Sequence, residues 1–507
     1  AKVDLATREA FVDVEVDPGE RYRIGDVKVV QQNNARVEPW RIEEQAREAL
    51  EQSSWYSPEL RNEVQQRVFD MKVFGAVQVR PGVGDPETGR IPLEVEGTEA
   101  PFHDVAVGFG AGFEQRRQEG HVIGEYTHRD FLGGLRRLTL RGRAGWAFIP
   151  NLYTAVGGGN AVTRSGPIAK LTAEVEQPRL FHPNLRLLTV LEGEVAIEPA
   201  YSYTGGRARL IVPWRPRTWL RIEPSYNLEM YRLSAGEAPL TGAADAPSLL
   251  LGCQGTCVLS YLEQRLAYDR RDDPQEPRKG VYLGIAFQEG GGPLGGSFDY
   301  LRILPEARGY YSVLPGQRLT FAARARLGTL IPRRGSDLES PIVARFFSGG
   351  DDMRGFSAQR LAPMRLVAKT NPTGQYDAEP VPVGGDGLFE MSFETRYELR
   401  KGIIIAGFAD SGFVTSEHVP LRASYFARNL FWAVGTGVRY VTPVGPVRLD
   451  LAYRLPVGPG LPVYESPGQQ LTYLPSSGCF GMGSGRPNHA GAPEGLCSVH
   501  LSIGEAF

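Results

Sequence analysis

Arg354 is the residue whose surroundings in the sequence most clearly suggest specific chemistry. It lies in the segment 347–356, Phe-Ser-Gly-Gly-Asp-Asp-Met-Arg-Gly-Phe, which is rich in glycine and ends on an aromatic residue. A guanidinium in a constricted interior needs a carboxylate partner, because it otherwise loses its hydration without compensation. Glu394 and Asp410, on two later segments that alternate like strands, are suitable partners. The alternative is a solvated loop arginine, with Glu394 and Asp410 as unrelated polar side chains.

The four cysteines form two local pairs in polar segments rich in glycine and proline, Cys253 with Cys257 and Cys479 with Cys497. Such spacing predicts two loop disulfides and an oxidising compartment. A Cys-x-x-x-Cys pair is also compatible with zinc, but zinc needs two further ligands and the histidines lie far away in the sequence. We therefore expect disulfides and no metal site.

No group of residues has the pattern typical of catalysis or of a cofactor site. His121 and His128 flank a predicted strand, but at a spacing of seven they fall on opposite faces, as surface histidines do. The glycine runs 157–159 and 290–292 lack the lysine and the strand-to-helix context of a phosphate-binding loop. The formal net charge is -2, so no overall field favours nucleic acid. We expect a protein that is not an enzyme, with no cofactor and no nucleic-acid partner.

The elements that would position these residues are mostly β-strands. The 507 residues contain no stretch of about 18 apolar residues, which excludes a helical membrane protein. Apolar and polar residues alternate instead: between Leu220 and Met230 the apolar side chains share one face and the charged ones the other. Many such segments approach the ~9 to 11 residues that a strand needs to cross a bilayer. A soluble β-sandwich with the same alternation is the alternative.

We expect sixteen antiparallel strands in a transmembrane barrel. Short connections alternate with long ones, so that the segments 232–255, 331–387 and 456–497 all fall on the outer side. Both cysteine pairs lie at these outer segments, although the strand assignment makes no use of them. The expected strands are 104–114, 121–130, 135–148, 167–177, 184–196, 204–213, 217–231, 256–268, 280–289, 299–311, 317–330, 388–399, 402–413, 430–441, 446–455 and 498–507.

A smaller α+β domain is predicted over residues 20–100, in the order strand, helix, helix, strand, strand. Ser57 and Pro58 provide an N-cap and a first-turn proline for the second helix. Pro92 has no N–H to donate, so its strand is expected near an edge of the sheet. Residues 1–19 contain one short strand, which we interpret as the remnant of a preceding domain.

The segment around Arg354 resembles the loop-six motif of the BamA/TamA family of outer-membrane proteins, which two-partner secretion transporters share. The motif reads Gly-Gly-x-x-x-Arg-Gly followed by an aromatic residue. Here it is formed by Gly349, Gly350, Arg354, Gly355 and Phe356, with Met353 where valine is common. Similar segments occur at 130–134, 268–274, 384–387, 391–394, 408–414, 435–440 and 442–450, so the resemblance covers nearly the whole chain.

The resemblance implies a mainly β fold, a 16-stranded antiparallel transmembrane β-barrel preceded by a POTRA domain of the order β-α-α-β-β. Residues 20–100 would be that POTRA domain, 1–19 the remnant of a preceding POTRA module, and 101–507 the barrel. Arg354 would form an ion pair with Glu394 and Asp410 that holds its loop against the inner wall. The protein would lie in the bacterial outer membrane, with the POTRA module in the periplasm and the long loops outside the cell.

The function implied by the resemblance is assembly of other β-barrels in the outer membrane. The partners would be unfolded outer-membrane protein clients and outer-membrane lipid, together with periplasmic chaperones and accessory assembly subunits. Two alternatives are a secretion pore of the two-partner type, which shares the loop-six motif, and a surface-exposed structural antigen with large disulfide-bonded loops. The motifs do not separate BamA from TamA, although the early strands and the Arg-Asp-Asp-Pro segment are closer to TamA.

The first and last barrel strands are expected to meet at a weak lateral seam. On the first strand Gly108, Gly110 and Gly112 leave one face nearly free of side chains, which weakens packing. An opened seam would expose N–H and C=O groups that can pair with a client strand. The alternative is that the glycines make room for a plug in the lumen. The last strand contributes Val499, Leu501, Ile503 and Phe507, a pattern similar to the carboxyl-terminal signal of outer-membrane barrels.

Overall fold

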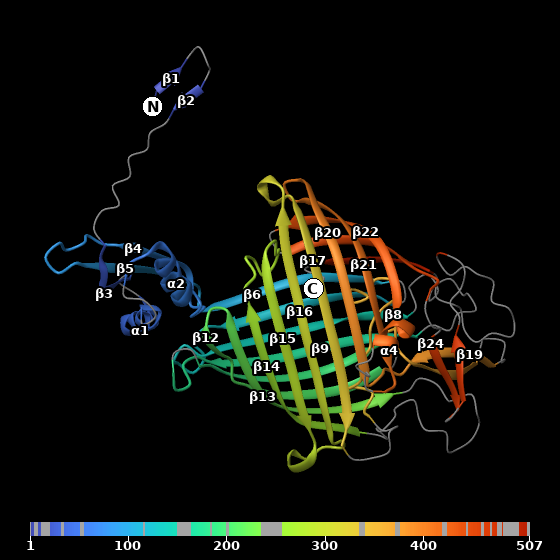
Figure 1. Ribbon diagram of the computed structural model, residues 1–507. Helices are drawn as coiled ribbons and strands as arrows, with labels where there is room; N and C mark the ends of the chain where they lie inside the picture. The colour runs from blue at the N-terminus through green and yellow to red at the C-terminus, as the bar shows by residue number, and fades with distance from the viewer. Residues whose placement is uncertain are drawn as a thin grey trace. The chain divides into compact units, whose positions relative to one another are not determined.

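The structure is a computed structural model in which the chain forms two compact units (Figure 1). The first unit comprises Ala1–His103 with Arg129–Leu135, and the second comprises Asp104–His128 with Arg136–Phe507. The residues that the structure describes are 2–4, 9–11, 21–31, 35–50, 55–114, 117–149, 164–182, 185–198, 202–234, 256–333, 340–370, 376–417, 423–442, 445–457, 461–466, 469–473, 479 and 496–503.

The first unit is an α+β domain built on a three-stranded sheet, in the predicted order β-α-α-β-β. Ser57 caps the second helix, because its Oγ accepts the Leu60 N–H at 3.1 Å. The apolar faces of both helices pack on the sheet, and residues such as Ile42, Val64 and Leu93 are fully buried there. A two-stranded antiparallel sheet precedes this domain in the chain. The elements are β1 (Lys2–Asp4), β2 (Glu9–Phe11), β3 (Arg23–Val30), α1 (Pro39–Leu50), α2 (Pro58–Phe69), β4 (Phe74–Pro81) and β5 (Arg90–Glu99).

Pro92 lies in the central strand of the sheet, so the expectation that it marks an edge is wrong. β5 pairs in parallel with β3 on one side and antiparallel with β4 on the other. The β3 register shifts between Ile24 and Val27, and the β4 ladder ends at Leu93. The missing N–H of Pro92 therefore falls at an irregularity, where it breaks no ladder, while its carbonyl accepts the Gly82 N–H at 2.8 Å.

The described residues of the second unit form a closed antiparallel β-barrel of sixteen strands, which confirms the predicted fold class (Figure 1). Consecutive strands pair with one another, and the last strand, β26, lies next to the first, β6. A short extra strand, β12 (Trp214–Arg217), pairs with β13. The barrel strands are β6 (His103–Glu114), β7 (Arg117–His128), β8 (Arg137–Ile149), β9 (Arg164–Gln177), β10 (Leu187–Ile197), β11 (Ser202–Ile211), β13 (Leu220–Ser234), β14 (Thr256–Asp269), β15 (Gly280–Gly290), β16 (Tyr300–Val313), β17 (Leu319–Pro332), β20 (Gly387–Arg400), β21 (Ile403–Thr415), β22 (Phe431–Thr442), β23 (Gly445–Arg454) and β26 (Cys497–Ile503).

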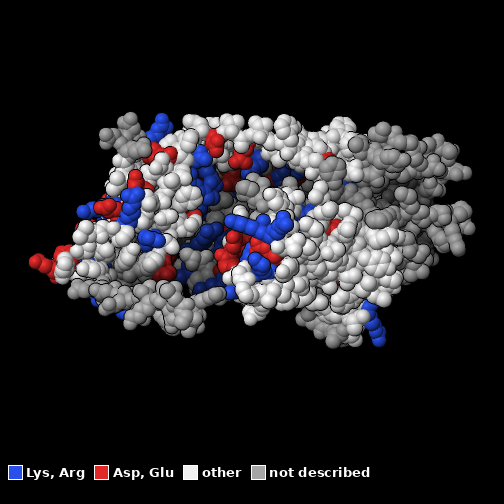
Figure 2. Space-filling view, turned by 90° about the horizontal axis from the view of Figure 1, so that it is seen from above, with Lys and Arg blue, Asp and Glu red and all other residues white. Residues whose placement is uncertain are grey.

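Side chains on the barrel strands point alternately outward and inward, which separates apolar from charged residues. Phe109 on β6 is 87% exposed on the outer side, whereas Arg324, Glu390 and Arg448 are buried inside. Figure 2 shows charged side chains gathered in a hollow, beside a wall that is nearly free of charge. An apolar outside and a polar inside are what a membrane barrel requires. Within the described ranges, no helix has the length and apolar character needed to span a membrane.

Two of the expected outer loops contain strands that the sequence did not predict. These strands form one sheet in the order β19-β18-β24-β25, in which β18 and β24 are parallel. Prolines in β19 and β24 obscure the strand pattern, and a parallel pairing between distant segments leaves no local signal. The additional elements are β18 (Met364–Thr370), β19 (Tyr376–Pro382), β24 (Leu461–Ser466), β25 (Gln469–Tyr473), α4 (Ala423–Asn429), η1 (Gly292–Leu294) and η2 (Pro315–Gln317).

The predicted disulfide between Cys479 and Cys497 is confirmed, with Cα atoms 4.6 Å apart. Cys497 is the first residue of β26, and its N–H donates to the carbonyl of Cys479 at 2.6 Å. Cys257 is also disulfide-bonded. Cys253, its expected partner, lies outside the described residues. The last barrel strand is thus covalently tied to the segment that precedes it.

Asp272 in the turn between β14 and β15 provides a test of this fold by pH. Its carboxylate accepts the N–H groups of Asp273, Arg278 and Lys279 at 3.0, 3.0 and 3.1 Å. Partial burial raises the pKa of Asp272, but these hydrogen bonds outweigh it and hold the pKa below its usual value. Because the pKa of Asp272 is lower in the folded protein than in the unfolded chain, its carboxylate stabilises the fold at pH values above the unfolded pKa of ~3.9. This stabilisation is lost as the pH falls through the folded pKa.

We therefore expect Asp272→Asn to lower the midpoint of thermal unfolding at pH 7. The difference in midpoint between Asp272→Asn and the wild type should become smaller as the pH falls below about 4. The midpoint is followed in detergent by the heat-dependent mobility of the barrel on gels. A gap between Asp272→Asn and wild type that stays constant from pH 7 to pH 3 would contradict this account of the turn.

Candidate functional site

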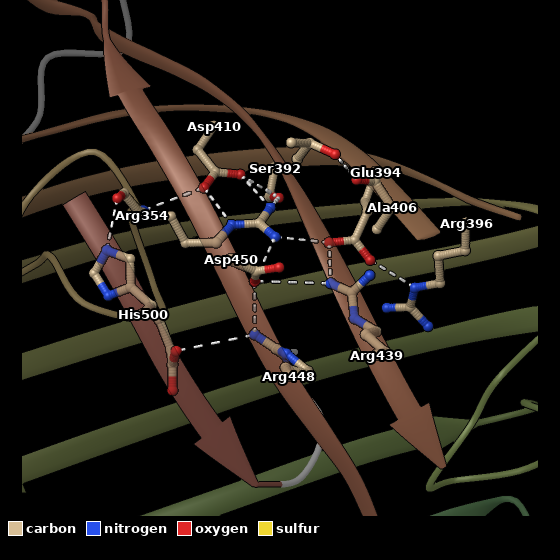
Figure 3. Close-up of polar contacts among 12 residues, drawn as sticks. Arg354, Ser392, Glu394, Arg396, Ala406, Asp410, Arg439, Arg448, Asp450 and His500 are labelled. Carbon is tan, nitrogen blue, oxygen red and sulfur yellow. Dashed lines mark hydrogen bonds and ion pairs between the residues drawn. The ribbon is translucent and has the colours of Figure 1, made fainter. Parts of the chain in front are cut away.

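The segment that contains Arg354 is a compact turn built on two glycines. Gly349 and Gly350 have positive φ angles of 117° and 66°. A Cβ at Gly349 would lie 2.1 Å from the carbonyl oxygen of Ser357, so only glycine fits there. The Gly350 N–H donates to the carbonyl of Phe356 at 2.8 Å and closes the turn. This backbone fold directs the Arg354 side chain toward the inner wall (Figure 3).

Arg354 contacts both carboxylates that the sequence singled out. Its Nε and Nη2 donate to the two oxygens of Asp410, each at 2.7 Å, and its main-chain N–H reaches the same carboxylate at 3.2 Å. Its Nη1 donates to Glu394 Oε2 at 2.7 Å. The Arg354 residue is only 1% exposed. The guanidinium therefore exchanges its hydration for charge-assisted hydrogen bonds to two wall strands, β20 and β21.

Two further residues that the sequence did not assign complete the Arg354 cluster, which we define as Arg354, Ser392, Glu394, Asp410 and Asp450. Arg354 Nη1 lies 3.4 Å from Asp450 Oδ2 on β23. Arg354 Nη2 donates to Ser392 Oγ at 3.2 Å, and Ser392 in turn donates to Asp410 at 2.6 Å. Asp450 alternates with outward-facing leucines on its strand, so its inward position was readable from the sequence.

Three additional arginines balance the carboxylates of the cluster. Arg396 Nε and Arg439 Nη2 donate to opposite oxygens of Glu394, both at 2.6 Å. Arg448 Nη2 lies 3.4 Å from Asp450. Buried ions are stable only when each has partners in good geometry, because desolvation otherwise outweighs attraction. Arg396 on β20, Arg439 on β22 and Arg448 on β23 supply those partners.

Glycines on β22 make room for the cluster. The Phe408 ring lies beneath the Arg354 guanidinium, with the ring centroid 3.4 Å from Cζ. A Cβ at Gly435 would lie 2.3 Å from Cζ of Phe408, and a Cβ at Gly437 would lie 1.7 Å from Asp450 Oδ1. The Gly-Thr-Gly sequence of β22 is thus a steric requirement of the neighbouring ring and carboxylate.

The other side of the Arg354 turn packs on the wall through apolar contacts. The rings of Phe356 and Phe431 meet edge to face at 5.5 Å, and Arg454 lies over Phe356 at 4.5 Å. Gly355 approaches β22 closely, because a Cβ on it would lie 2.5 Å from the Cβ of Ala433. Met353 is fully buried, which explains why an apolar residue precedes the arginine.

Additional polar contacts attach the same loop to neighbouring strands. Asp352 lies 2.9 Å from Arg324 Nη2 and 3.1 Å from Arg326 Nη2, both on β17. Ser348 Oγ donates to Glu390 on β20 at 2.5 Å. The loop is therefore attached across the inner wall and not at Arg354 alone.

The glycines of β6 face the barrel interior, where two of them lie under side chains of β7. A Cβ at Gly110 would lie 2.2 Å from His121 Nε2, and one at Gly112 would lie 3.0 Å from Glu119 Cγ, whereas nothing lies within 4 Å at Gly108. Gly110 and Gly112 thus give space to inward side chains of the next strand, and Gly108 borders open space.

The last strand shows an alternation of its own. Val499 and Leu501 face outward, while the side chains of Ser498 and His500 face inward and are buried. The Ile503 side chain and the whole of Phe507 lie outside the described residues. Ser498 Oγ and His500 Nε2 both contact the main-chain carbonyl oxygen of Arg354, the latter at 2.7 Å. No sequence pattern marks these two residues, because their partner is a main-chain atom.

The register explains how this contact arises. Glu394, Phe408, Gly435, Ala452 and Ser498 are successive cross-strand neighbours on β20, β21, β22, β23 and β26. The small residues in the middle of this row, Gly435 and Ala452, leave room for the Phe408 ring, over which the Arg354 guanidinium lies. Among the described residues, no group of His, Cys, Asp and Glu side chains is arranged to hold a metal ion.

Gly435→Ala is expected to destabilise the barrel by about 1 to 3 kcal/mol, because the new methyl group must displace Phe408 or the Leu451 carbonyl, 2.2 Å away. Gly407→Ala on the adjacent strand is the matched control, since nothing lies within 4 Å of its Cβ. Thermal unfolding in detergent measures both variants. Equal unfolding midpoints for Gly435→Ala and Gly407→Ala would show that the glycine does not serve the cluster.

Residues 186–462 match the family described as the Omp85 superfamily domain. One curated relative is the outer membrane protein assembly factor BamA of Nitratidesulfovibrio vulgaris, 25% identical over 219 residues, or 43% of this chain and 25% of that protein. The protein of the same name from Neorickettsia risticii is 25% identical over 260 residues, or 51% of this chain and 32% of that protein. The chain therefore spans about a quarter to a third of the length of these relatives.

Two solved structures share the fold. BamA from Haemophilus ducreyi lacking POTRA domains 1-3 superposes with a TM-score of 0.58 at 14% identity, over 85% of this chain and 81% of that one. CdiB from Acinetobacter baumannii superposes with a TM-score of 0.51 at 10% identity, over 86% of this chain and 71% of that one. Because the family match covers more than half of a chain that folds as this barrel, the protein belongs to the Omp85 superfamily and resides in the outer membrane.

Proposed function

We propose that this chain is an outer-membrane β-barrel assembly factor, which receives unfolded clients in the periplasm and inserts them through a lateral seam between β6 and β26. The observation that carries the proposal is the set of contacts made by Arg354, by which one loop is attached inside the lumen to β20 and β21 and to the seam strand β26. The curated relatives are named as outer membrane protein assembly factors, which supports the same role.

The attachment of the loop favours insertion over passage through the lumen. Arg354 is held on β20 and β21, and Asp352 on β17, so the loop lies along the inner wall over three neighbouring strands. Clearing the loop from the lumen to conduct an unfolded polypeptide would break the buried ion pairs of Arg354, and each broken pair leaves an uncompensated charge. The likeness to CdiB concerns the fold alone, and the secretion pore therefore remains the alternative to be tested.

The strands at the seam have properties suited to parting. On one side of the seam, β6 carries glycines at alternate positions on its inner face, and Gly108 borders open space. Few side-chain contacts lower the cost of opening, and the freed edges offer N–H and C=O groups to a client strand.

We infer the following division of the chain: 1–19 as the remnant of a preceding POTRA module, 20–100 as a POTRA domain, and 101–507 as the barrel. In the first unit β3 and β4 are the outer strands of the sheet, so an extended client segment can pair with either of them. The proposed partners are unfolded outer-membrane proteins, periplasmic chaperones, accessory assembly subunits and the lipid around the barrel. The proposed role requires no catalytic residue.

Replacing Arg354 tests the proposal directly. Arg354→Ala leaves Asp410 buried without its main partner and removes one of the three arginines around Glu394. Breaking a buried ion pair in this way typically costs about 3 to 5 kcal/mol. We expect the loop to loosen from the wall and the rate of client assembly to fall at least about tenfold. Cells depleted of the wild-type protein and supplied with each variant are analysed by an inventory of their outer-membrane proteins.

Arg333→Ala is the matched control for this experiment. Arg333 forms an ion pair of 2.7 Å with Glu289, but its side chain is 47% exposed, so the loss should be nearly neutral. The charge reversal Asp410→Arg should resemble Arg354→Ala. If depletion of the wild-type protein leaves the inventory unchanged, the proposed function is wrong; if Arg354→Ala supports normal assembly, the role of the cluster is wrong.

Conductance separates an assembly factor from a secretion pore. A lumen that holds an attached loop should pass little current in a planar lipid bilayer, and Arg354→Ala should raise both the current and its fluctuations, because the loop is loosened. A large and steady current through the wild-type protein, unchanged by Arg354→Ala, would favour the pore.

A further inference from the structure

Ser498 and His500, which we call the last-strand pair, attach the seam strand β26 to the loop of Arg354. Both act on one atom, the main-chain carbonyl oxygen of Arg354, and His500 Nε2 does so at 2.7 Å (Figure 3). The hydroxyl of Ser498 and Nε2 of His500 are 3.1 Å apart. A carbonyl oxygen can only accept hydrogen bonds, so the fitting state of His500 carries a proton on Nε2.

The contact is dry, so it cannot be exchanged easily for water. Ser498 and His500 are 3% and 5% exposed, and the carbonyl they hold belongs to a residue that is 1% exposed. A buried carbonyl that loses its donors keeps the full penalty of its desolvation. Displacing β26 from the wall therefore destabilises the Arg354 turn, and displacing the turn removes the partners of the only inward-facing side chains described on β26.

Arg354 is bound from two sides. Its guanidinium is held by Glu394 on β20 and Asp410 on β21, while its carbonyl is held by β26. Asp410 also fixes the main chain of Arg354, because it accepts the N–H of that residue at 3.2 Å. The contacts with Asp410 therefore fix the position of the Arg354 carbonyl as well. One residue thus links interior wall strands to the strand at the seam.

We propose that the last-strand pair couples the loop to the seam, so that the Arg354 turn and β26 stabilise one another. Such coupling is reciprocal: whatever loosens the loop loosens β26 to the same extent, and the reverse. The inference rests on the proposed function for its purpose, namely control of a seam through which clients insert. The coupling itself is a property of the folded barrel and can be measured without any client.

Hydrogen exchange followed by mass spectrometry tests the coupling in protein reconstituted in lipid nanodiscs. The double variant Ser498→Ala with His500→Leu removes both donors and replaces them with apolar side chains of similar bulk. We expect amide exchange to accelerate about tenfold in the loop segment 348–361 and in β26 together, with β15 and β16 unchanged. Acceleration in β26 with the loop protected as in the wild type would overturn the proposal, as would no change in either segment.

Two further variants keep the test decisive. His500→Gln retains an N–H donor, so it should restore slow exchange in both segments when Ser498 is present. Ser498→Ala alone should accelerate both segments less than the double variant does, and it carries the test if the double variant fails to fold. Client assembly is measured in parallel. Coupled exchange in a protein that assembles no client would refute the proposed function and leave the coupling intact. Normal client assembly with uncoupled exchange would refute the coupling and leave the proposed function intact.

Discussion

The buried guanidinium of Arg354 is the constraint on which the interior of this barrel depends. A charge that is 1% exposed must find its partners in the protein, and it finds them on β20, β21 and β23. The identities of Glu394, Asp410 and Asp450 follow from that single requirement. Because the partners stand on separate strands, the pairing also fixes where the loop lies relative to the wall, with a precision that a single ion pair would not give.

The carboxylates that bind Arg354 in turn determine which residues can surround them. Three acids gathered around one arginine would repel one another, and Arg396, Arg439 and Arg448 offset that repulsion. Two glycines provide the space for these groups. Gly435 leaves room for the Phe408 ring, and Gly437 leaves room for the Asp450 carboxylate. The glycines of β22 suggest a weakly packed strand in the sequence, but in the structure they are required by the side chains of the neighbouring strands.

Much of this could be predicted from the sequence. Strict alternation gave all sixteen barrel strands, and the need of Arg354 for carboxylates pointed to Glu394 and Asp410, which the structure brings into contact with it. Asp450 was within reach of the same reasoning, since it faces inward by the same alternation.

Other features left no readable pattern. The last-strand pair binds a main-chain carbonyl, which has no side-chain signature. The sheet of β18, β19, β24 and β25 depends on parallel pairing between remote segments, and Pro92 was misplaced because a register shift absorbs its missing N–H. In each case the deciding partner is backbone, whose contacts depend on the fold and not on residue type.

The two attachments of Arg354 differ in strength, and the difference gives each a separate role. The contacts of its side chain are charge-assisted and bidentate, whereas the contacts of its carbonyl are ordinary hydrogen bonds, which are roughly half as strong. The loop is therefore held firmly on the interior wall and more weakly on β26. Under load the weaker contacts part first, and the turn then loses the two donors to its carbonyl and becomes less stable. The guanidinium contacts still attach the loosened turn to β20 and β21, so β26 can restore both hydrogen bonds when the seam closes.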